Sequence, residues 1–551
     1  MQILSSVLIG CWVFFFGLFP GISTIPGAFA AEAGHMKLAL IHFAAAHKQP
    51  EENRAALLTL NRQAAEAGAA LILNTEMAVS GYSFRSRKDI APYTETDDGP
   101  TIRAMGALAA AHGVYIGITF PERDPATGIF YNSAFLLEPE GRIVARYRKM
   151  LTERRWARPG EPRQPGVADT PWGRLGMVIC ADSYSGLIAR GMALKAVDLL
   201  WIPANWPSMG GLDPLPLWRA RALENGYYLA ACNRTGKDLT LDCTQAVSCV
   251  FDPAGHQMLS GRSENSRAYF VDLPLDHNGK WAQVSRSEKM GQRNVGHYRP
   301  IYLRPWLENF TSFYKLPEPG MMSIHCYVPA KPAAALDELA VRIAGQADAH
   351  PALWVIPQMD AAQVDTAALA ALAKKHRVGL AVTVRRAGAA PGQWLFTPDE
   401  TLAFSDAKAS ASPSDAFPFS IHHFGPAAIA MVPANAFAHP ETAIALSKLG
   451  CDLVILSEAA LTEENFLLAR VKALSGIAVA ACATNGAQIT GVQDMHLNWD
   501  KIGREGSGAV TYTLDTTKTR KKMFFDFIDY DLLLSNENES AGITPFLSGG
   551  F

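Results

Sequence analysis

The chain has 551 residues, more than a single hydrophobic core usually serves, so two large domains are expected. Its 50 Lys and Arg residues balance 52 Asp and Glu residues, and a formal net charge of −2 argues against nucleic acid as a partner. The eight cysteines are scattered, with no Cys-x-x-Cys pair and no zinc-like Cys/His spacing. Neither a disulfide framework nor a metal site is therefore predicted, and no cofactor is expected.

Residues 1–35 form an apolar leader that is excluded from the fold prediction. Ala28 and Ala30 supply the small-x-small pattern of a secretory cleavage site, which predicts a signal peptide and a periplasmic or extracellular location. Two prolines in the leader would break a membrane-spanning helix. Two alternatives stay open: the leader is retained as an anchor, or translation starts at Met36 and the protein is cytoplasmic.

Apolar strands alternate with amphipathic helices from residue 37 onward. This alternation predicts an α/β fold built of layers. The expected strands lie at residues 37–43, 69–74, 114–120, 133–137 and 143–147, and the expected helices at residues 51–68 and 101–112.

Two of these strands end beside a charged residue suited to catalysis. Glu76 follows the strand at 69–74, where a carboxylate next to apolar residues is partly desolvated and can serve as a general base. Lys149 follows the strand at 143–147 and would place an ammonium group at a neighbouring strand end.

A third strand, at residues 176–179, leads into Cys180. A thiol at a strand end can act as a nucleophile when a base and a cation lie nearby. The alternative is a cysteine that only packs in the core, because free cysteine is among the most often buried residue types.

The second half of the chain repeats motifs of the first in the same order, which predicts two homologous domains. We expect a catalytic domain over residues 36–310, a second domain over residues 320–535 and a tail over residues 536–551. The repeated motifs are residues 41–43 at 324–326, residues 107–109 at 371–373, and residues 230–232 at 480–482.

Glu76, Lys149 and Cys180, in this order and at three strand ends, resemble the nitrilase superfamily of carbon–nitrogen hydrolases. The resemblance covers nearly all of the first domain. It implies two tandem four-layer α-β-β-α sandwich domains, of which the second is degenerate. The other stretches that carry it are residues 131–134, 158–160, 200–207, 220–225 and 233–234.

The resemblance implies a catalytic role for each of the three residues. Glu76 takes the proton of Cys180, and the thiolate attacks an amide or nitrile carbon. Lys149 and the backbone N–H of Ala181 stabilise the negative charge that develops on the substrate oxygen. Loss of ammonia or an amine leaves a thioester, which water activated by Glu76 hydrolyses to a carboxylic acid.

Glu153 is the best match to a further glutamate that supports the lysine in many family members. Its alternative is an exposed loop acid. The chain departs from the family pattern at Thr75, where proline is usual, and at Ala181, where an aromatic residue is common.

The same resemblance suggests which side chains line the substrate pocket. Asp182 keeps the acid that commonly follows the nucleophile, and Tyr82 follows the glutamate motif. Aromatic residues near the cysteine suggest an apolar wall, although such residues more often fill cores. We expect the pocket to be lined by Tyr82, Asp182, Asn205 and Trp206.

In the second domain the corresponding positions have lost their chemistry. Gln358 stands where the first domain has Glu76, and Val432 or Pro433 where it has Cys180, whereas Lys408 matches Lys149. This domain is therefore predicted to be inert and to pair with the first within one chain. The alternative is a pocket that senses a ligand.

Cofactor-independent hydrolysis of a small-molecule amide is the favoured function, because Cys180-x-Asp182 resembles the amidase branches of the family. A nitrilase or an N-carbamoyl hydrolase is the first alternative. A thioester-based acyltransferase or a non-catalytic scaffold is the second. Homo-oligomers are also expected, because similar proteins form dimers.

Overall fold

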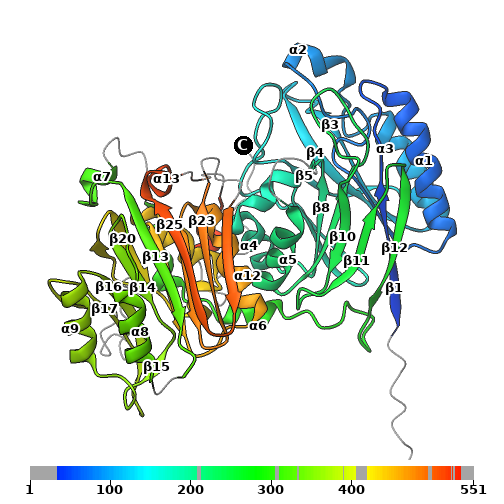
Figure 1. Cartoon of the computed structure of the whole chain (residues 1–551). Coiled ribbons are helices and arrows are strands. Elements are labelled where there is room, and N and C mark those ends of the chain that lie inside the picture. The colour runs from blue at the N-terminus through cyan, green and yellow to red at the C-terminus, as the bar shows by residue number, and fades with distance from the viewer. Residues whose placement is uncertain are drawn as a thin grey trace, which may run out of the picture.

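The structure is a computed structural model that describes residues 34–207, 213–303, 310–331, 334–388, 390–404, 418–493, 499–522, 524 and 528–534. The predicted leader up to residue 33, Lys408 and the predicted tail lie outside the described residues. Four sheets make up the described part, two in each half of the chain (Figure 1).

The first sheet contains the beginning of the described chain. Its central strands β1 (His35–His42), β2 (Leu71–Asn74) and β3 (Tyr115–Arg123) are parallel, and the outer ones are antiparallel. Helices α1 (Pro50–Glu66) and α3 (Pro100–His112) cover its outer face and bury an apolar stripe against it. The strand order is β12 (Arg267–Pro274), β1 (His35–His42), β2 (Leu71–Asn74), β3 (Tyr115–Arg123), β4 (Phe130–Leu137) and β5 (Ile143–Arg148).

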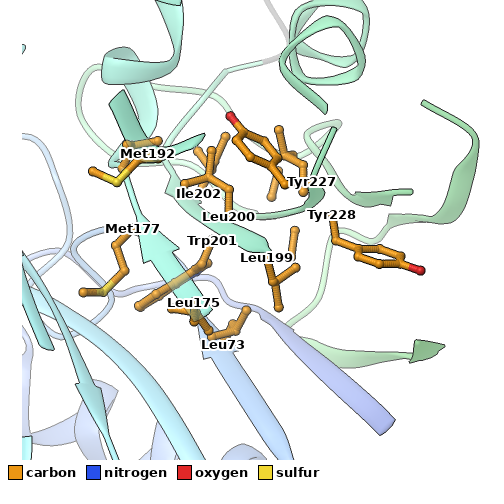
Figure 2. Close-up of a cluster of buried hydrophobic side chains, with 14 of the residues drawn as sticks. Leu73, Leu175, Met177, Met192, Leu199, Leu200, Trp201, Ile202, Tyr227 and Tyr228 are labelled. Carbon is orange, nitrogen blue, oxygen red and sulfur yellow. The ribbon is translucent and has the colours of Figure 1, made fainter. Parts of the chain in front are cut away.

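The second sheet packs face to face on the first. Its strand β8 is buried on both faces, which explains its continuous apolar run. Leu73 of the first sheet meets Leu175, Met177 and Trp201 of the second in their shared core (Figure 2). Helices α4 (Gly186–Leu194) and α5 (Pro214–Asn225) cover the other face. The strand order is β11 (Gln257–Arg262), β10 (Val247–Phe251), β9 (Tyr228–Asn233), β8 (Leu199–Ala204), β7 (Gly173–Met177) and β6 (Val167–Thr170).

The second half repeats this strand order in two further sheets. The first comprises β18 (Thr401–Ala403), β17 (Gly392–Phe396), β16 (Gly379–Arg385), β14 (Ala352–Val355), β13 (Met321–Val328) and β25 (Gly508–Asp515), with β15 (Met359–Asp360) beside β16. The second comprises β19 (His422–Phe424), β20 (Ala427–Met431), β21 (Leu453–Glu458), β22 (Ala478–Ala483), β23 (Gly486–Val492) and β24 (Trp499–Glu505).

The α/β fold class is confirmed, and the repeated strand order agrees with two tandem α-β-β-α sandwiches. The domain boundaries stay a prediction. Predicted and observed elements of the first domain agree to within a few residues. The short helices and helical turns are α2 (Arg87–Ile90), η1 (Ala91–Tyr93), η2 (Cys180–Tyr184), α6 (Arg286–Gly291), η3 (Val295–Tyr302), α7 (Phe310–Phe313), α10 (Ala434–Phe437), η6 (Lys472–Ser475), α13 (Thr516–Arg520) and α14 (Tyr530–Leu534).

The two halves meet through helices. Helices α8 (Ala335–Ala344) and α9 (Thr366–His376) lie at one end of the molecule, and α1 and α3 at the other (Figure 1). Between them, α4 and α5 face α11 (Pro440–Lys448) and α12 (Glu463–Val471), with shared apolar clusters across the contact. In the described ranges, no helix has the length and apolar character needed to cross a membrane.

The strand register corrects the predicted counterpart of Cys180. The N–H of Val178 donates to the carbonyl of Trp201, and the N–H of Val432 donates likewise to that of Ile455. Val432 therefore corresponds to Val178, so Ala434 stands in the position of Cys180. The prediction of Val432 or Pro433 was wrong because it aligned Gly173, which is in a strand, with Gly425, which is in a turn.

The register also decides the other two comparisons between the halves. Cys232 and Cys482 contact the carbonyls of Ile41 and Tyr327, so the predicted match between residues 41–43 and 324–326 was wrong by three residues. Gln358 keeps its predicted place, because β14 pairs with β13 and β16 as β2 pairs with β1 and β3.

Candidate active site

Strand ends bring Glu76, Lys149 and Cys180 into one site. Glu76 follows β2, and Lys149 is the residue directly after β5. Strand β7 ends at Met177, earlier than predicted, because the N–H of Ile179 turns to the Asp182 carboxylate. Cys180 opens the helical turn η2 with a φ of +45°, a left-handed conformation that a non-glycine residue rarely adopts and that is typical of functional positions.

Glu76 is buried, at 1% exposure, and three donors hold its carboxylate. Its Oε1 accepts hydrogen bonds from Lys149 Nζ and from Asn132 Nδ2, both at 2.8 Å. Its Oε2 accepts the backbone N–H of Asn205 at 2.8 Å. The carboxylate is therefore fixed in one orientation, as a base that must receive a proton from a defined direction requires.

Lys149 lies between two carboxylates and is 1% exposed. Its Nζ also donates to Glu153 Oε1 at 2.9 Å, and the Tyr82 hydroxyl donates to the same oxygen. Burial opposes the charge of Lys149, but Glu153 and Glu76 outweigh it and raise the pKa of Lys149 well above its ordinary value. Lys149 is therefore a permanent cation and not a proton donor.

Cys180 is 7% exposed, and its thiol interacts electrostatically with Glu76 and Lys149. Burial, followed by the negative charge of Glu76, raises the pKa of Cys180 well above its ordinary value. Lys149 and the backbone N–H of Asn205 act in the opposite direction. The resting sulfur is therefore a neutral thiol, and it needs a base to become a nucleophile.

Glu153 lies beside Lys149 with 9% of its side chain exposed, so it is not an exposed loop acid. Burial disfavours its ionised form, but Lys149 lowers the pKa of Glu153 below its ordinary value. It lies four residues after Lys149 in the chain, and the spacing allows a direct ion pair. Tyr82, predicted as a pocket residue, contacts this pair through its hydroxyl.

Asp182 ties the Lys149 segment to the Cys180 turn. Its carboxylate is buried and accepts the Leu151 N–H at 2.7 Å and the Tyr147 hydroxyl at 2.8 Å. Burial raises the pKa of Asp182 to about 6. Asp182 therefore holds the Lys149 segment and the Cys180 turn together, whereas it was predicted to line the pocket. The N–H of Ala181 donates to no partner within the described residues.

Asn205 and Trp206 directly follow strand β8, and Asn205 contacts Glu76. The Asn205 side chain donates to the Glu76 carbonyl at 3.0 Å. The Trp206 ring is 5% exposed and lies 4.6 Å from the Tyr184 ring, centroid to centroid. Trp206 also lines a cavity of about 310 Å³ that continues past Asn233 to Arg262, and among the residues predicted to line the pocket it is the one that borders this cavity.

Sequence reasoning missed the role of Asn132 as a donor to Glu76. The residue stood in the 131–134 stretch that carried the family resemblance, which was the available indication. It also missed the Tyr147–Asp182 contact, because side chains from β5 and η2 meet only in the folded chain. Within the part of the chain that the structure describes, no group of three or more His, Cys, Asp or Glu side chains could hold a metal ion.

The matching place in the second half lacks both reacting groups. Gln358 stands at the position of Glu76, and its backbone N–H donates to the Glu458 carbonyl at 3.1 Å. Ala434 stands at the position of Cys180. An amide cannot accept a thiol proton and a methyl group cannot attack a carbonyl, so this half cannot perform the same reaction.

Known proteins resemble the first half of the chain. A family model described as carbon-nitrogen hydrolase matches residues 37–283. A protein described as a probable nitrilase from Schizosaccharomyces pombe is 33% identical over 213 residues, which cover 37% of this chain and 75% of that protein. An N-carbamoylputrescine amidase from Arabidopsis thaliana is 32% identical over 207 residues, which cover 34% of this chain and 67% of the amidase. Among solved structures, Nit3 from Saccharomyces cerevisiae, a member of branch 10 of the nitrilase superfamily, has a TM-score of 0.41 and 22% identity over 47% of this chain and 94% of that one.

Proposed function

Because the chain belongs to the carbon–nitrogen hydrolase family, we propose that it hydrolyses a small-molecule amide through a thioester on Cys180. One observation carries the proposal: the Glu76 carboxylate binds the Lys149 ammonium at 2.8 Å, and both charges act on the Cys180 thiol. A base, a fixed cation and a nucleophile thus occupy one buried site.

The reaction begins with transfer of the Cys180 proton to Glu76. The thiolate attacks the amide carbon, and the charge that builds on the oxygen is stabilised by Lys149 and by the Ala181 N–H. The proton on Glu76 passes to the departing nitrogen, which leaves as ammonia or an amine. Glu76 then takes a proton from water, and the hydroxide attacks the thioester to release the carboxylic acid and restore the thiol.

A nitrile or an N-carbamoyl compound is the second candidate substrate. Relatives of the first half include a protein described as a probable nitrilase and an N-carbamoylputrescine amidase. The same nucleophile and base serve all three substrate classes, because each presents an electrophilic carbon bonded to nitrogen. The amide is favoured because Cys180-x-Asp182 resembles the amidase branches.

We further propose that the second half is an inert partner of the first. Gln358 and Ala434 replace the base and the nucleophile. The helices α11 and α12 cover α4 and α5, which lie directly behind the active site. The second half therefore takes the place that a second subunit would occupy in a dimer.

The proposal is tested by measuring ammonia release from a panel of amides, nitriles and carbamoyl compounds. The full-length protein should release ammonia from at least one amide, and Cys180→Ala should release none. Rapid quenching followed by intact-mass measurement should detect an acyl adduct that maps to Cys180. Turnover that survives in Cys180→Ala, or the absence of turnover across the whole panel, would refute the assignment.

A further inference from the structure

We propose that Lys472, from the second half of the chain, is a positioning residue for the turn that carries Cys180, and that it acts through Glu224 and Arg221. This inference rests on the proposed function and extends it, because it says how the inert half supports the active one. Lys472 opens η6 directly after α12, and it is 2% exposed.

A continuous set of hydrogen bonds joins Lys472 to the active-site turn. Lys472 Nζ donates to Glu224 Oε2 at 2.7 Å, and Arg221 donates to Glu224 Oε1. Arg221 Nε donates to the Ser183 carbonyl and its Nη2 to the Tyr184 carbonyl, both at 2.8 Å. Ser183 and Tyr184 belong to η2, the turn that begins with Cys180.

The turn depends on these contacts because it is short. A single helical turn leaves its last carbonyls without partners in the helix, and the Arg221 guanidinium satisfies two of them. The Ser183 hydroxyl in turn donates to the Cys180 carbonyl at 2.7 Å. The position of the guanidinium therefore affects the left-handed backbone of Cys180.

Lys472 determines how Glu224 binds Arg221. With Lys472 on Oε2, Glu224 offers only Oε1 to the guanidinium. Both oxygens would become available if the ammonium were absent, and a carboxylate binds arginine best through two parallel hydrogen bonds. That arrangement would draw the guanidinium away from the Ser183 and Tyr184 carbonyls. Burial opposes ionisation of Glu224, but Lys472 and Arg221 lower its pKa, and without Lys472 the Arg221 guanidinium still favours the charged carboxylate.

The surrounding interface is held by other contacts, so the variants below should fold. Glu441 of α11 pairs with Arg190 at 3.2 Å and with Arg293 at 2.9 Å, and all three side chains are buried. Gly186, which follows the Cys180 turn, lies against Pro440, and a Cβ on this glycine would come within 2.7 Å of the proline ring. A residue of the second half thus contacts the chain just after the turn.

The test is Lys472→Met in the full-length protein, with the rate of Cys180 alkylation by iodoacetamide as the first readout and ammonia release as the second. We expect both rate constants to fall by about tenfold to a hundredfold, the scale of a small misplacement of a reacting group. KM should change little, because Lys472 does not touch the substrate. Lys472→Arg, which keeps the charge, should recover most of the loss.

The pH profile of alkylation separates positioning from simple loss of charge. A misplaced thiol lowers the plateau rate and leaves the midpoint unchanged, whereas loss of a distant charge shifts the midpoint. A matched control is Glu463→Gln, which breaks the Arg219–Glu463 ion pair of 2.6 Å between α5 and α12 at the same interface. The partners of Arg219 are Glu463, Glu464 and the Gly255 carbonyl, none of which belongs to the turn. This control should alkylate at the wild-type rate.

The double variant Glu224→Gln/Lys472→Met removes the carboxylate that would draw Arg221 away once the ammonium is lost. We expect it to alkylate faster than Lys472→Met, because a neutral glutamine does not attract the guanidinium. Should Lys472→Met fail to fold, Lys472→Gln supplies the readout, because its side chain is neutral but can still donate to Glu224. Wild-type alkylation in Lys472→Met, or in Lys472→Gln if the methionine variant does not fold, would overturn the inference, as would a double variant as slow as Lys472→Met. Alkylation needs no substrate, so a wild type that hydrolyses nothing would refute the proposed function alone.

Discussion

Replacing Lys149 by methionine tests the electrostatic design of the site. The change keeps a side chain of similar length but removes the ammonium that binds Glu76 at 2.8 Å and Glu153 at 2.9 Å. Two buried carboxylates would then face each other across the vacated position. Their repulsion, taken at about 5 Å and an effective dielectric constant of about 20, is roughly 3 kcal/mol.

That repulsion disfavours two charged carboxylates side by side, so the variant pair would share a proton that the wild type does not hold. Loss of the cation beside the oxyanion costs a further factor of about a hundred to a thousand in kcat. The variant should therefore be slow at every pH, and the acid limb of its pH–rate profile should lie at higher pH than that of the wild type.

The assay is kcat/KM for ammonia release between about pH 5 and 9, with thermal unfolding as a check on stability. Lys237→Met serves as the control, because this lysine forms an exposed ion pair with Asp242. Its profile should match that of the wild type. A Lys149→Met variant with wild-type kcat/KM, or with a slow rate but an unmoved acid limb, would refute this account of the charges.

Three further predictions concern single side chains. Cys180→Ala should abolish all ammonia release, because Ala434 in the second half cannot act as a nucleophile. Residual ammonia release that disappears when Gln358 or Ala434 is also changed would contradict this. Asp182→Asn should lower the free energy of unfolding by about 1–3 kcal/mol and also lower kcat, because the Leu151 N–H or the Tyr147 hydroxyl loses its acceptor. Chemical denaturation and ammonia release measure the two effects, and an unchanged kcat would contradict the role of Asp182 in holding the Cys180 turn. Burial, against the attraction of Glu441, lowers the pKa of His439 from 6.5 to about 4. The unfolded chain therefore binds this proton more tightly, and up to about 3 kcal/mol of stability should be lost as the pH falls from 6.5 to 4. Urea unfolding of His439→Gln should show a smaller loss over this range, and an equal loss would exclude His439 as its source.

The ends of strands β2 and β5 in the first domain could be predicted, because at each of them a run of apolar residues is followed closely by a polar residue. Glu76 comes two residues after the end of β2, and Lys149 directly follows β5. Their convergence was inferred from a family resemblance and not from spacing, since 73 residues separate them in the chain. The structure shows the direct contact between these two side chains.

Contacts between distant helices could not be predicted. Arg221 and Glu224 have the spacing of an ordinary surface pair on a helix, and nothing in the sequence shows that Lys472 joins them. The contact of Arg221 with Glu224 is the ion pair that this spacing allows, but its contacts with the Ser183 and Tyr184 carbonyls are not visible in the sequence. The counterpart of Cys180 was misplaced for a similar reason, because only hydrogen-bond register distinguishes a strand glycine from a turn glycine.

The central claim is that Glu76 activates Cys180, and alkylation with iodoacetamide at neutral pH tests it most directly. All the described cysteines are buried, and peptide mapping of the full-length protein should find rapid modification at Cys180, which has Glu76 as a base, and slow modification at the others. The account predicts that Glu76→Gln, which keeps the shape of the side chain but cannot take the proton, reduces the Cys180 rate to that of the buried cysteines. Equal rates for Cys180 in the wild type and in Glu76→Gln would contradict it.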